Sequence, residues 1–185
     1  NAYLQYPGLP ESIKDINVDL KISRKEGPDL NNIKVDLSTL KMAFLENKIN
    51  ASLQVSNLMT DPAIKSNLIS YVNLSELNQA FPLSATDSYT GIINSDILLA
   101  GKLSSIENEK YEDFDAKGNL RIKEMAYNTP SLPYTVNIDS LHFIFSPANL
   151  KLANFSSRIG ASDISANGDI DNYLGYLLKS DTLRG

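Results

Sequence analysis

The chain has 185 residues, of which 42% are hydrophobic and 21% charged, and its net charge is -5. This length favours one sizeable core rather than two domains, and this composition excludes a disordered chain. The acidic balance makes nucleic acid a poor partner, because the phosphate backbone requires a basic surface. Cysteine is absent, which excludes disulfides, thiolate metal sites and cysteine nucleophiles.

Apolar and polar residues alternate along most of the chain, a pattern typical of strands with one apolar and one wet face. In chain order, the alternation predicts strands around residues 16–22, 33–37, 49–55, 93–103, 114–122, 136–138, 141–145 and 164–170. Short helical turns are predicted at 61–63, over 74–81 and from 173 to 178. Roughly nine to eleven strands of ordinary length predict an all-β fold with mostly antiparallel neighbours.

The alternation changes parity at two places. Ile138 is even and Leu141 is odd, and Leu152 is even and Phe155 is odd. Each change requires a turn or a β-bulge to return the apolar side chains to one face.

Two stretches fifty residues apart resemble one another: FDAKGNLRI at 114–122 and ISANGDIDN at 164–172. Both place an alanine and a glycine on the apolar face of a strand, where glycine weakens the ladder and leaves nothing to pack. One explanation is a sharp bend or a close approach by a facing group. The other is an apolar groove in a curved sheet, with room for a lipid chain. The spacing also suggests a modular, elongated architecture.

The chain contains few candidates for chemistry. His142 is the one histidine, and the alternation predicts that it faces solvent, away from Leu141 and Phe143. Asp163, Asp169 and Asp171 are close in sequence but lack the spacing of an EF-hand calcium loop. Nucleophile-elbow, phosphate-loop and dinucleotide motifs are absent. We therefore expect a protein that is not an enzyme and that uses no metal or cofactor.

Several segments resemble the AsmA-like proteins of Bacteroidetes-type bacteria. They are YTGIINSD (89–96), LAGKLSSIE (99–107), FDAKGNL (114–120), FSPANLKL (145–152) and SDISANGDIDNYLGYLL (162–178). The family is similar to bridge-like lipid transfer proteins, whose repeated β-sheets form a long apolar groove. The resemblance implies a periplasmic segment of a cell-envelope protein that is anchored in the inner membrane by a helix elsewhere in the parent. The implied role is phospholipid transport and outer-membrane maintenance, and the family offers no catalytic residues to carry over.

We therefore expect residues 1–185 to be one β-rich segment of a larger envelope protein, since the chain begins at Asn1 without a methionine. Its expected partners are phospholipid acyl chains and the rest of the parent chain, with membrane contact through the parent's anchor only. The predicted groove face comprises Ala116, Gly118, Leu120, Ile122, Val136, Ile138, Phe143, Phe145, Ala166, Gly168 and Ile170. The alternative is a closed β-sandwich that binds a protein or glycan through loops at 84–89 or 128–134.

Overall fold

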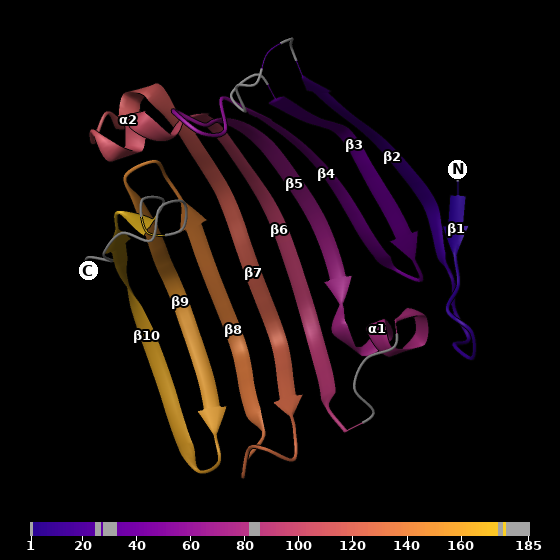
Figure 1. Cartoon of the computed structure of the whole chain (residues 1–185). Coiled ribbons are helices and arrows are strands. Elements are labelled where there is room, and N and C mark those ends of the chain that lie inside the picture. The colour runs from indigo at the N-terminus through magenta and orange to yellow at the C-terminus, as the bar shows by residue number, and fades with distance from the viewer. Residues whose placement is uncertain (1, 25–26, 28–32, 82–85, 174–175, 177–185) are drawn as a thin grey trace.

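The computed structural model describes residues 2–24, 27, 33–81, 86–173 and 176, and within them the chain folds into one 10-stranded sheet. Every strand pairs antiparallel with its neighbours in sequence, so the sheet is a meander from β1 at one edge to β10 at the other. The sheet is open and curved (Figure 1). The strands are β1 (Ala2–Leu4), β2 (Ile13–Arg24), β3 (Ile33–Phe44), β4 (Asn47–Ser56), β5 (Ala63–Asn73), β6 (Ser88–Lys102), β7 (Phe114–Asn128), β8 (Val136–Phe145), β9 (Asn149–Ile159) and β10 (Ser162–Asp171).

This architecture confirms the predicted all-β fold with a curved, antiparallel sheet. The described strands do not form the second layer that a closed β-sandwich requires. In a sandwich, the apolar faces of two sheets pack against each other. Here the alternating pattern gives a single sheet whose apolar face is not paired with the face of another sheet.

The predicted bulges are also present. The pairing of β8 with β9 shifts register between Ile138 and Ser140, where the sequence changes parity for the first time. The pairing of β10 with β9 shifts between Ala166 and Gly168, opposite the second change. Each bulge returns the next apolar residue to the same face of the sheet.

Two short helices connect strands, and only the first was predicted. Helix α1 (Leu74–Ala80) follows β5 directly, and the side chain of Asn73 caps it by accepting from the N–H of Ser75. Helix α2 (Leu103–Glu107) and the 3-10 turn η2 (Tyr111–Asp113) lie between β6 and β7. The extension of the sixth strand to Leu103 was wrong, because β6 ends at Lys102.

The hydrogen bonds that Asp61 accepts from the first turn of α2 account for this error and for a second one. Asp61 accepts hydrogen bonds from the backbone N–H and the hydroxyl of Ser104, both at 3.0 Å. The predicted turn at 61–63 is absent, because Ala63 already begins β5. Asp61 therefore accepts hydrogen bonds at the start of a helix, as its residue type suggested, but that helix, with Lys102 at its N-cap position, begins far away in the sequence.

The C-terminal turn predicted at 173–178 is described only in part. The N–H of Tyr176 donates to the carbonyl of Asn172 at 3.1 Å, which is the spacing of one helical turn. Residues 174–175, 177 and 178 lie outside the described residues.

The buried side chains form two clusters at opposite ends of the strands, next to the two helices (Figure 1). Ile106 of α2 packs with Phe114, Ala116 and Tyr173 at one end. Ala80 of α1 packs with Ile13 and Phe44 at the other. The helices thus cover two ends of the apolar face and leave its middle without a second layer in the described part of the chain.

A buried asparagine fastens α1 to the sheet. Asn47 is 1% exposed, and its Nδ2 donates to the carbonyl of Phe44 and to the carboxylate of Glu76. Its Oδ1 accepts from the backbone N–H of Asn73, the residue that caps the helix. One side chain therefore joins the β3–β4 turn to the start of α1.

Candidate functional site

The candidate site is the apolar face of the sheet, which the strand register assembles row by row. Residues that are partners in an antiparallel ladder point to the same face. One row crosses the sheet from β3 to β10 and consists of Leu40, Ala51, Leu68, Ile97, Gly118, Phe145, Leu150 and Ile170. The single-residue alternation of each strand therefore becomes a mainly apolar surface on one side. The hydrogen-bonded pair Ser70 and Ser95 interrupts it in the row between Ile49 and Leu120.

The register places all of the predicted groove residues on this face. Leu120 partners Phe143, and the row continues through Leu152 to Gly168. The next row joins Ile122 to Ala166 by way of Leu141 and Phe155. Beyond the bulges, Ile138 and Val136 partner Met125 and Tyr127 of β7 on the same side. Because the bulges correct the parity, residues of odd and even number share one surface.

The face is not equally accessible along its length. Ala116 is 3% exposed beneath α2, and Phe145 and Ile170 pack against the same cluster. The ring of Phe145 meets that of Tyr173 edge-on, with centroids 5.9 Å apart. These residues belong to the structural core, while Leu120, Ile122, Val136, Ile138 and Phe143 are half-buried and Ala166 and Gly168 are exposed.

Sequence reasoning missed the half of this face that lies on the first strands. Val18 is 52% exposed and Ile22 66% exposed on β2, and at the opposite edge Ile164 of β10 is 42% exposed. Leu53 and Leu68 continue the surface between the edges. The same alternation runs through these strands, so the signal was present; it was read as strand structure alone.

The two similar stretches occupy different environments. β7 and β10 are separated by two strands of an antiparallel meander, so the stretches run in opposite directions. Gly118 has φ +135°, and a Cβ there would overlap the carbonyl oxygen of Asp96 and lie 2.8 Å from Cα of Ile97. Gly168 has open space, with no atom within 4 Å of an added Cβ. The close approach of the Asp96 carbonyl therefore explains the glycine at position 118. Open space beside the backbone is found only at Gly168.

The opposite face of the sheet is polar, and His142 lies on it, as predicted. Its partners in the ladder are Arg121 and Asn154, and its Nε2 is 2.7 Å from Oδ1 of Asn119. Burial, and then the charge of Arg121, lower the pKa of His142 below its ordinary value. Because a carboxamide oxygen only accepts, the neutral ring donates through Nε2 in this arrangement.

Tyr173, in the buried cluster beneath α2, has a structural role. Tyr173 is 2% exposed, its hydroxyl donates to the carbonyl of Ser146 at 2.9 Å, and burial raises its pKa to about 12. Among the described residues, His, Asp and Glu side chains do not gather in groups of three or more that could hold a metal ion. The described helices are also too short or too polar to cross a membrane.

Comparison of the chain with protein-family models, with curated proteins and with solved structures found no match. Its function must therefore be inferred from the residues and their arrangement.

Proposed function

We propose that this chain is a segment of an AsmA-like cell-envelope protein and that its open apolar face holds lipid acyl chains. In this proposal the segment is periplasmic, the parent is anchored in the inner membrane, and the activity is phospholipid transport that maintains the outer membrane. The segment acts without catalysis and without a cofactor. The resemblance of its sequence to that family motivates the location and the role, and the open face motivates the ligand.

The observation that supports the ligand is an apolar surface without a covering layer in the described residues. A sheet normally buries such a face against a helix layer or a second sheet. Here α1 and α2 cover only its two ends, and large apolar side chains such as Leu20, at 53% exposed, remain accessible. Extended apolar patches of this kind mark binding surfaces for apolar partners.

The proposed mechanism is passive. An acyl chain that lies along the face displaces water from its own methylenes and from the side chains beneath it. Each buried methylene contributes about 0.8 kcal/mol, so about ten of them contribute roughly 8 kcal/mol before the loss of motional freedom is subtracted. The head group stays in solvent, so the face need not distinguish between head groups.

Phe143 and Ile144 provide a matched test, because they are neighbours on β8 and point to opposite faces. Phe143 partners Leu120 on the apolar face, whereas Ile144 partners Asn119 on the polar face. We expect the purified chain to carry phospholipid, detected by native mass spectrometry and by lipid extraction. Phe143→Asp should remove most of that lipid, and Ile144→Asp should leave it in place.

Circular dichroism of both variants serves as the control for folding. A Phe143→Asp variant that keeps both its fold and its full lipid load would contradict the proposed site. A wild-type chain that remains free of lipid after incubation with phospholipid vesicles would contradict the proposed function.

A further inference from the structure

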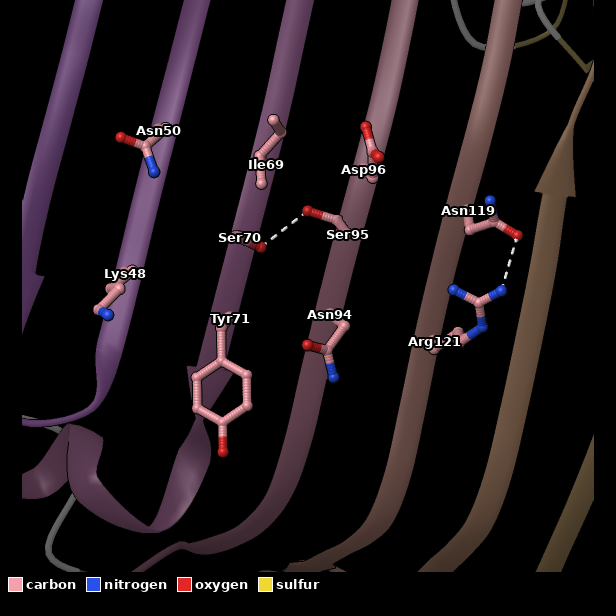
Figure 2. Close-up of a pocket in the computed structure, with 10 residues that line it drawn as sticks. All are labelled: Lys48, Asn50, Ile69, Ser70, Tyr71, Asn94, Ser95, Asp96, Asn119 and Arg121. Carbon is pink, nitrogen blue, oxygen red and sulfur yellow. Dashed lines mark hydrogen bonds between the residues drawn. The ribbon is translucent and has the colours of Figure 1, made fainter.

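A second surface suggests binding, and it lies on the polar face, away from the proposed lipid site. A shallow pocket of about 360 Å³ spans β4 to β7 (Figure 2). Its central row is Lys48, Tyr71, Asn94 and Arg121, which are successive ladder partners and therefore share one face. The neighbouring row, Ile49, Ser70, Ser95 and Leu120, points to the other side of the sheet.

The charges of this row are arranged for an extended anionic ligand. Lys48 and Arg121 lie at its two ends, and among the described residues neither forms an ion pair. Adjacent strands are about 4.8 Å apart, so the backbones of β4 and β7 are separated by roughly 14 Å. That separation exceeds the size of a single small anion. It fits a short linear molecule that lies across the strands.

Between the two cations, the pocket offers an aromatic ring and several amides. Figure 2 shows the ring of Tyr71 and the amide of Asn94 between Lys48 and Arg121. Tyr71 and Asn94 are half-buried, so their positions are restricted by the neighbouring strands. The ring provides a flat surface for the C–H face of a sugar, and an amide both donates and accepts hydrogen bonds.

The second row of the pocket is oriented by its own hydrogen bonds. Oδ1 of Asn119 accepts from Nη2 of Arg121 at 3.2 Å and from Nε2 of His142 at 2.7 Å. With its oxygen occupied, Asn119 presents its amide N–H groups as donors. Asp96 is its ladder partner and supplies a carboxylate acceptor in the same pocket. A ligand that uses both must donate and accept hydrogen bonds at separate positions, as the several hydroxyl groups of a saccharide do.

We propose that this pocket binds an acidic saccharide, with its acid groups near Lys48 and Arg121 and its hydroxyls on the amides and Asp96. The site is independent of the lipid proposal, because it uses the opposite face of the sheet. Either proposal can therefore fail while the other holds.

The test is a two-dimensional NMR titration of the ¹⁵N-labelled chain with tri-galacturonate. Maltotriose serves as the neutral saccharide and inorganic phosphate as the simple anion. We expect saturable shifts of amides in β4 to β7 with tri-galacturonate, and at least tenfold weaker binding of the other two probes. Arg121→Gln should weaken tri-galacturonate at least tenfold. Lys117→Gln, on the same strand and face but outside the pocket, should change the affinity for tri-galacturonate less than twofold.

Three results would overturn the proposal. Without saturable shifts, the pocket is an ordinary wet face. If phosphate binds as tightly as tri-galacturonate, the pocket is a site for simple anions and not for a saccharide. If Arg121→Gln and Lys117→Gln weaken tri-galacturonate binding equally, Arg121 does not have the assigned role. The spectra of both variants report whether the sheet remains folded.

Discussion

The two glycines of the similar stretches should respond in opposite ways to the same substitution. In Gly118→Ala, the new Cβ must occupy a backbone with φ +135° and overlap the carbonyl oxygen of Asp96. That carbonyl cannot move away easily, because Asp96 is held in the ladder opposite Asn119. A side chain in such a backbone region costs about 1–3 kcal/mol, and overpacking adds about 1–3 kcal/mol. We expect a loss of roughly 2–6 kcal/mol in the free energy of unfolding.

In Gly168→Ala, the new methyl group meets no atom within 4 Å. Alanine also restricts the unfolded chain, so the substitution should be neutral or stabilising by about 0.5 kcal/mol. Urea unfolding followed by circular dichroism measures both variants on one scale. The reasoning is refuted if Gly118→Ala lies within 0.5 kcal/mol of the wild type, or if the two substitutions cost about the same.

Three further predictions concern the polar and buried groups. Burial raises the pKa of Tyr173 to about 12, above the value of about 10 in the unfolded chain. The neutral Tyr173 hydroxyl therefore makes its full contribution to the free energy of unfolding below pH 10, and that contribution is lost as the pH rises toward 12. The stability of the wild type relative to Tyr173→Phe should therefore fall by roughly 2–3 kcal/mol over that interval, as measured by urea unfolding at each pH. Asn47→Ala should cost about 2–4 kcal/mol, because it leaves buried backbone groups without partners; a cost below 1 kcal/mol would contradict the anchoring role. Arg121→Gln should raise the pKa of His142, as followed by NMR of the ring protons, and an unchanged value would exclude the charge as a cause.

Much of the sheet could be predicted, because alternation is a local property of the sequence. It located most of the long strands but not β5 or β9, and the parity changes after Ile138 and Leu152 located the bulges. Helix α2 could not be found in this way, since the side chain that accepts from its first turn, Asp61, lies on a distant segment. A five-residue helix carries little signal of its own when a remote side chain stabilises it.

The sequence predicts which residues share the apolar face, but not which of them are accessible to a ligand. Alternation placed Ala116 and Leu120 correctly on one face, but only the packing of α2 shows that Ala116 is covered. Gly118 and Gly168 have similar neighbours in sequence and opposite environments in the structure. What separates them is the partner strand, which is a property of the fold.

The central claim is that acyl chains lie on the open apolar face, and methyl NMR with a spin-labelled lipid tests it most directly. A phospholipid with a doxyl group on its acyl chain broadens the methyl signals of the residues that it touches. The account predicts broadening at Ile97, Leu120 and Ile122, with Ile106 protected beneath α2 and Ile144 protected on the polar face. Equal broadening of Ile144 and Leu120, or no broadening of Leu120 at saturating lipid, would contradict the account.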